Sequence, residues 1–227
     1  MLYDAGVKRA DLNQLFDEEL RDRRLLQHPF YRRWEAGQLE LGELSEYAGQ
    51  YRHFEAALPG VLDTVARGLE DAGARALVQA NLSDELGEPS PHLALFDDFT
   101  AAVGGSTSAD ASPATEALIA LYLDRSASDP VGGLAALAAY EVQAPAIASS
   151  KADGLRGHYG LSPAGTRFWD VHGVMDERHA AWSLDALASV VQDEDTVRTA
   201  ARQAADAWWA FLDERELSHT AWAGQPA

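Results

Sequence analysis

Histidine and carboxylate side chains recur at helical spacing late in the chain. His172, Asp176 and His179 stand four and three residues apart. On an α-helix, which turns ~100° per residue, their side chains share one face within an arc of roughly 60°. That face would present two imidazoles and a carboxylate, which together can bind a cation. A solvated polar stripe is the alternative interpretation of this pattern.

A second pair of such residues, Glu85 and His92, is separated by seven positions. Seven residues make about two helical turns, so the two side chains would share a face if the helix were continuous. Pro89 and Pro91 lie between them, and a proline inside a helix interrupts its hydrogen bonding. A carboxylate that caps a loop, followed by a surface histidine, is the alternative interpretation.

Glu141 lies inside an apolar segment, residues 134–147. An ionised carboxylate buried among Ala and Leu costs free energy unless a cation or a hydrogen-bond donor compensates its charge. Residues 134–150 contain no Lys or Arg. The sequence therefore predicts that Glu141 meets either an arginine of another helix or a bound metal ion.

Three separate segments thus offer the same kind of metal ligand. The candidate metal-ligating residues are Glu85, His92, Glu141, His172, Asp176 and His179. Three carboxylates and three imidazoles suit two first-row ions, iron or manganese, with positions left open for dioxygen. The chain contains no cysteine, which argues against structural zinc and excludes disulfides, iron–sulfur clusters and thiolate nucleophiles.

Helices must position these residues, because apolar side chains recur three and four apart and no alternating strand pattern occurs. We expect an all-α bundle of about seven to eight helices in a single domain over residues 1–227. The longer helices are expected near residues 11–26, 41–69, 74–88, 92–103, 113 onward, 132–155, 163–192 and 195–217. The apolar segment 132–155 contains Glu141, Gln143 and Pro145, and it is expected to be too short and too interrupted to cross a bilayer.

Composition argues against several classes of partner. The 36 acidic residues outnumber the 18 basic ones and give a formal net charge of −18. This field repels phosphate backbones and anionic bilayers, so we expect neither nucleic acid nor a membrane as a partner. The N-terminal residues show no basic stretch followed by an apolar one, so we expect no signal peptide and a cytoplasmic location.

The order and spacing of the six candidate ligands resemble those of the haem-oxygenase-like dimetal oxidases, whose pattern is Glu-x6-His, a lone Glu, and His-x3-Asp-x2-His. Within that superfamily the chain is most similar to the Chlamydia protein associating with death domains (CADD) family of p-aminobenzoate synthases. The likeness is carried by residues 28–34 (His-Pro-Phe-Tyr-Arg-Arg-Trp), Tyr47, residues 133–145 and Lys151. The resemblance implies a TenA/PqqC-like fold, two iron ions or a mixed iron–manganese pair, dioxygen, an external reductant and a homodimer.

The resemblance also implies roles for individual side chains. In that family, which serves folate metabolism, a tyrosine at the position of Tyr31 is consumed as the source of the aromatic ring. A lysine at the position of Lys151 supplies the amino nitrogen, and Tyr47 and Tyr140 complete the candidate catalytic set. Lys151 is one of two lysines against 16 arginines, and arginine is a far poorer nitrogen donor. The CADD pattern has a tyrosine where this chain has Phe168; if that hydroxyl takes part in electron relay, turnover differs here, while the dimetal assignment is unaffected.

Other interpretations stay open at this stage. From the residues alone, Tyr31 is better explained as a core aromatic beside Phe30 and Trp34, and Lys151 equally well as an ordinary lysine near a helix end. A dimetal oxygenase or decarboxylase that acts on an external fatty acid or amino acid is the second functional hypothesis. The third is a metal-free interaction protein whose acidic surface binds a basic partner.

Overall fold

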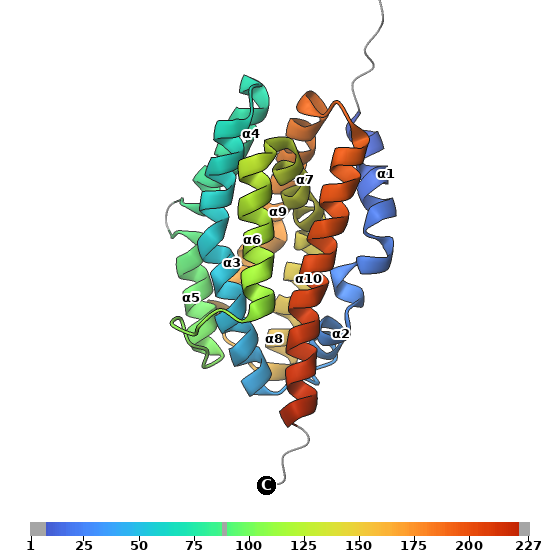
Figure 1. The fold of residues 1–227 in the computed structure, drawn as a ribbon. Helices are drawn as coiled ribbons and strands as arrows, with labels where there is room; N and C mark the ends of the chain where they lie inside the picture. Colours follow the sequence, from blue (N-terminus) through green and yellow to red (C-terminus); the bar gives the residue numbers. More distant parts are fainter. Residues whose placement is uncertain (1–7, 88–89, 223–227) are drawn as a thin grey trace, which may run out of the picture.

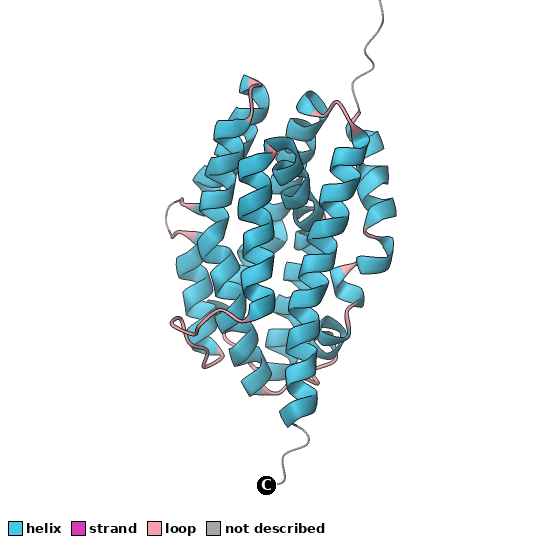
Figure 2. Cartoon of the chain, viewed as in Figure 1, coloured by secondary structure: helices cyan, strands magenta, loops and turns pink. Residues whose placement is uncertain are grey.

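The computed structural model describes residues 8–87 and 90–222, and within these ranges every regular element is a helix (Figure 1, Figure 2). The elements are α1 (Arg9–Glu19), two 3-10 turns (Arg21–Arg23 and Leu25–Gln27), α2 (Pro29–Glu35), α3 (Leu41–Gly68), α4 (Ala72–Glu85), α5 (His92–Ala102), α6 (Pro113–Ser128), α7 (Pro130–Glu141), α8 (Ala144–Tyr159), α9 (Pro163–Val190) and α10 (Glu194–Trp222). The predicted all-α class is confirmed, although the described residues form ten α-helices and not seven or eight. Residues 1–7, assessed for a signal peptide, and Glu88, the expected end of the fourth helix, lie outside the described residues.

Prolines mark where several helices begin. Pro29, Pro113, Pro130 and Pro163 occupy the first position of α2, α6, α7 and α9. At that position the missing N–H needs no intrahelical partner, and the fixed φ of proline suits a helix. Pro59 instead lies within α3, which continues through it. The predicted helix start at Pro113 is therefore confirmed.

The segment expected to form one helix over residues 132–155 forms two. α7 ends at Glu141 and α8 begins at Ala144, with Pro145 in its first turn. Pro145 has no N–H to donate to the carbonyl of Glu141, so the hydrogen bonding of α7 stops there. The break leaves Glu141 at the C-terminal end of α7.

The first expected helix, residues 11–26, is also shorter in the structure. α1 ends at Glu19, and the chain continues through the two 3-10 turns. There the N–H of Arg23 donates to the carbonyl of Leu20 at 2.9 Å, an i to i+3 bond in place of the α-helical one.

By length and composition alone, one stretch of the described chain, Pro130–Tyr159, could cross a membrane. It is thus longer and more apolar than the sequence analysis expected. Within the protein, 72% of the most apolar 18-residue part of this stretch is buried. Packing in the bundle core accounts for these apolar side chains.

α9 is the helix around which the candidate metal ligands assemble. It packs against α4, α5, α7 and α8, and in Figure 1 it runs through the middle of the bundle behind α6 and α10. α6 and α7 approach each other closely at Gly133, where an added Cβ would lie 2.7 Å from the Cα of Ser126. This packing brings segments that are distant in sequence to one place in the core.

Candidate metal centre

The six predicted ligands converge in one buried site. They come from the end of α4, the start of α5, the end of α7 and one face of α9, and each side chain is at most 8% exposed. Burial excludes the solvated polar stripe that the sequence left open for the α9 residues. This convergence supports the prediction of a metal site, because the charges of six ionisable groups buried together must be balanced by one another or by a bound cation.

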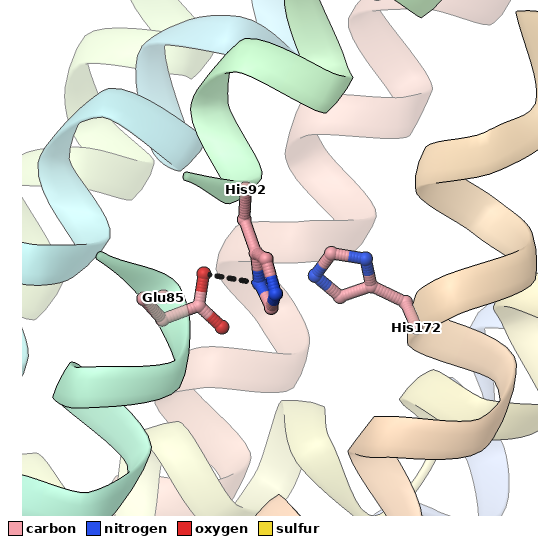
Figure 3. Close-up of side chains that lie close together, drawn as sticks. All are labelled: Glu85, His92 and His172. Atoms are coloured by element: carbon pink, nitrogen blue, oxygen red, sulfur yellow. Dashed lines mark hydrogen bonds and ion pairs between the residues drawn. The ribbon is translucent and has the colours of Figure 1, made fainter. Parts of the chain in front are cut away.

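Glu85 and His92 form the side of the site that α4 and α5 contribute. The Nδ1 atom of His92 lies 2.8 Å from Oε2 of Glu85, as Figure 3 shows. α4 ends at Glu85 and α5 begins at His92, so the contact spans a helix break and not a continuous helix. Together with His172 they form a group whose candidate ligand atoms all lie within 4.8 Å of one another.

α9 supplies the opposite side of the site. The Nδ1 atom of His172 bonds the backbone carbonyl of Phe168 at 2.8 Å, which leaves Nε2 for the site, and its ring centroid lies 4.4 Å from that of His92 (Figure 3). The Nε2 atom of His179 lies 3.2 Å from Asp84, and its Nδ1 lies 3.4 Å from Asp176. Hydrogen bonds to the outer nitrogen are how proteins orient metal-binding histidines.

The surroundings of the Glu141 carboxylate favour a bound metal ion most directly. Asn81 donates to its Oε1 at 2.7 Å. The other oxygen, Oε2, is buried and has no hydrogen-bond partner among the described residues, and no arginine of another helix pairs with it there. Glu141 lines the cavity at the centre of the site. An unpartnered carboxylate oxygen beside several imidazoles fits a bound cation.

Electrostatics in the site follow from burial and close charges. Burial lowers the pKa of His172. Burial also lowers the pKa of His179, but the hydrogen bond to Asp176 and the charges of Glu141, Asp176 and Glu85 raise it more, to about 9. Burial raises the pKa of Glu85, and its bond to His92 and the nearby imidazoles lower it by more than that. Without a metal ion, the charges of the buried carboxylates and imidazoles balance one another only in part.

The cavity is small and has one aromatic wall. The space open to the centre of a water-sized sphere is about 30 Å³. Besides predicted ligands and aliphatic side chains, the cavity is lined by Tyr51, Phe54, Glu55, Tyr140, Phe168 and Trp169. About 10–15 Å³ measured in this way holds one water, so the cavity has room for small ions or diatomic molecules.

Three of the four predicted catalytic residues, Tyr31, Tyr47 and Lys151, form a second buried cluster beyond this wall. The hydroxyls of Tyr31 and Tyr47 are 2.8 Å apart, and Lys151 Nζ lies 2.5 Å from the Tyr47 hydroxyl. The Nζ atom also lies 4.5 Å from the centre of the Tyr31 ring and 4.1 Å from that of Trp169. The fourth, Tyr140, lines the metal cavity, and its hydroxyl bonds that of Tyr51.

A family model described as an iron-containing redox enzyme matches residues 45–210 of the chain. The chain belongs to this family. A 4-aminobenzoate synthase from Nitrosomonas europaea is 38% identical over 218 residues, which cover 88% of this chain and 89% of that protein. A 4-aminobenzoate synthase from Chlamydia muridarum is 31% identical, and the match covers 92% of each chain.

Solved structures of other proteins show the same fold. A TenA homologue from Pseudomonas syringae has a TM-score of 0.79 at 15% identity, with 92% of this chain and 96% of that chain covered. A CADD-like protein of unknown function from Nostoc punctiforme has a TM-score of 0.79 at 18% identity, with 94% and 99% covered. The predicted haem-oxygenase-like fold and the prediction of an iron-containing redox enzyme are confirmed, which leaves the metal-free interaction protein without support.

Three residues of the site were not identified from the sequence. Tyr51 and Trp169 line the cavity and also lie within 4.8 Å of Lys151 Nζ, measured to the ring centres. Glu55 lines the same cavity. A signal was present, because Tyr47, Tyr51 and Glu55 are spaced by four residues and therefore follow one face of α3.

Proposed function

We propose that this enzyme forms 4-aminobenzoate from its own Tyr31, with nitrogen from Lys151, in a reaction that uses a bound metal pair, dioxygen and an external reductant. The relatives named 4-aminobenzoate synthase support the product. The observation that carries the proposal is the position of Lys151. Its amine lies 4.5 Å from the centre of the Tyr31 ring and 4.1 Å from Trp169, which lines the metal cavity.

Two iron ions, or an iron–manganese pair, would be held by the six buried ligands. Such ions supply one-electron chemistry with dioxygen, which the protein's own side chains cannot provide. The residues Asp84 and Asn81 would hold the ligands His179 and Glu141 in orientation through the bonds described above.

Lys151 is suited to act as a nitrogen donor because it is held away from water. Its side chain is 2% exposed, and burial lowers its pKa well below the ordinary value, an effect that the charge of Glu55 opposes only in part. A neutral amine keeps its lone pair free for bond formation. An arginine at this position would remain charged.

Tyr47 lies between the two proposed reactants. Its hydroxyl bonds both the Tyr31 hydroxyl and the Lys151 amine, so it can carry a proton between them. Burial raises the pKa of the Tyr31 phenol, and the bond to Tyr47 lowers it by less. The phenol therefore stays protonated until it is oxidised.

The size of the cavity favours an internal reactant over the external substrate that the sequence left open. A space of about 30 Å³ accommodates roughly two waters on the usual measure. A fatty acid does not fit in this space, whereas the ring of Tyr31 already lies beside the amine.

Two variants test the assignment. Tyr31→Phe and Lys151→Arg proteins should take up iron like the unmodified protein and release no 4-aminobenzoate after exposure to dioxygen and a reductant. Tyr122→Phe is the matched control, since Tyr122 is a buried tyrosine whose hydroxyl bonds Trp208 and not the Lys151 cluster. Product from either test variant would refute its assigned role.

Stoichiometry separates the internal reactant from an external one. We expect at most one product molecule per chain, together with mass losses confined to the two peptides that contain Tyr31, the source of the ring, and Lys151, the source of the nitrogen. Repeated turnover with both peptides intact would establish the external-substrate alternative.

A further inference from the structure

Glu55 is a buried acid that the six-ligand pattern does not include. It lies on α3, two turns beyond Tyr47, and its side chain is 5% exposed. It lines the same cavity as Glu85, Glu141 and Asp176. In the described part of the chain, no lysine or arginine nitrogen lies within 4.0 Å of its carboxylate.

The surroundings of Glu55 are unfavourable for an acid unless a cation is present. Burial raises the pKa of its carboxyl, and the negative charges of Glu85 and Asp176 raise it further. Two effects oppose this rise only in part: the charge that Lys151 would carry if it were protonated, and a hydrogen bond from the Tyr51 hydroxyl. An ionised group in such a place needs a close positive charge.

Charge counting indicates where that positive charge would come from. Two divalent ions carry four positive charges, and the six predicted ligands contribute three carboxylates with three neutral imidazoles. One positive charge would remain in a site from which water is almost excluded. A fourth carboxylate makes the assembly neutral, and Glu55 is the further acid that lines the cavity.

We propose that Glu55 is a seventh ligand of the metal centre, binding one ion through its carboxylate, with Tyr51 holding the carboxylate in place. This inference rests on the metal site of the proposed function. A carboxylate suits iron(II) and manganese(II). The position on α3 would also join the metal centre to the helix that carries Tyr47 and the aromatic wall.

Manganese(II) binding to metal-free protein tests the inference without any turnover. Unmodified protein, Glu55→Gln and Asp63→Asn are titrated, and bound metal is counted by electron paramagnetic resonance and elemental analysis. Asp63 lies on the same helix, and its side chain is 42% exposed and pairs with Arg67, so it serves as the matched control. We expect two ions per chain for the unmodified protein and for Asp63→Asn.

For Glu55→Gln we expect at least one of the two ions to bind about tenfold or more weakly. The melting temperature of the metal-free variant should equal or exceed that of the unmodified protein, because the substitution replaces a buried acid, close to the acids Glu85 and Asp176, with a neutral amide. Unchanged affinity and stoichiometry for both ions would overturn the inference. An equal loss of stability with and without metal, at unchanged affinity, would assign Glu55 a merely structural role and would overturn it too.

A crystal structure of the manganese-loaded, unmodified protein provides a second measurement that does not depend on a variant folding. A Glu55 oxygen should lie about 2.0–2.6 Å from an ion. Both oxygens beyond 3.5 Å would overturn the inference even if Glu55→Gln binds metal weakly. If the unmodified protein binds no metal, the proposed function fails as well, whereas loss of the seventh ligand alone leaves it standing.

Discussion

Replacement of Lys151 by methionine tests whether the buried amine is neutral. Lys151 is surrounded by the rings of Tyr31, Trp34, Tyr47, Tyr51 and Trp169, and burial lowers its pKa well below 10.5. Between the folded pKa and the ordinary one, the unfolded chain holds a proton that the folded chain lacks. The free energy of unfolding must therefore rise with pH in this window and lose this gain as pH falls.

The magnitude follows from proton linkage. Each pH unit within the window changes the free energy of unfolding by about 1.4 kcal/mol, and methionine at position 151 removes this dependence. The variant also loses the bond from Nζ to the Tyr47 hydroxyl, which costs about 0.5–1.5 kcal/mol. That cost does not vary with pH in this range. It therefore changes the difference in the free energy of unfolding between the two proteins by a constant, and the slope of this difference against pH stays the same.

Urea denaturation of metal-free protein at pH 8.5, 9.0 and 9.5 measures the slope. The stability of the unmodified protein relative to Lys151→Met should rise by about 1.4 kcal/mol across that unit. Lys8→Met changes the chain's other lysine, which is exposed, and its free energy of unfolding should depend on pH as that of the unmodified protein does. The same pH dependence for Lys151→Met and the unmodified protein would show a protonated amine in the folded state and would refute the reasoning that assigns it a free lone pair.

Three further predictions concern the metal site and the packing around it. Asn81→Leu removes the donor to Glu141 Oε1 and should weaken manganese binding about 10–100-fold, measured by titration. Iron(II) at about 100 times its dissociation constant should add roughly 2.7 kcal/mol of stability per site, and chelation should abolish the gain, measured by anaerobic thermal unfolding. Gly154→Ala would place a Cβ 2.9 Å from Trp34 and should cost about 1–3 kcal/mol. Gly157→Ala on the same helix meets nothing within 4 Å and should add about 0.5–1 kcal/mol in the same denaturation assay.

The parts of the site that depend on local helical geometry were predictable from the sequence. His172, Asp176 and His179 lie within one helix, so their spacing fixes their common face. Glu141 was identifiable because an apolar segment without a cation leaves a buried acid uncompensated. The contact between Glu85 and His92 was predicted from a two-turn spacing, and it forms across the break between α4 and α5 instead.

Other features could not be predicted because tertiary packing determines them. Lys151 stands next to polar residues in the sequence and resembles a lysine near a helix end, yet α8 continues to Tyr159 and aromatic rings from three other helices enclose the amine. Glu55 is one of several acids on α3, and only the fold shows that it faces the cavity. Pro145 marked a helix boundary, but a proline in a first turn and one in an interior look alike in the sequence.

The burial of Tyr31 has a consequence for the lifetime of the protein. The ring is 2% exposed and packs against Phe30, Trp34 and Tyr47. Under the proposed function each molecule gives up this ring once, and emptying such a space in a packed interior costs about 3–5 kcal/mol, a large part of the usual 5–15 kcal/mol that holds a domain folded. Melting curves recorded before and after one round of reaction would measure the loss. Used copies would unfold more readily than fresh ones, so proteases could clear exhausted molecules while sparing those still able to react.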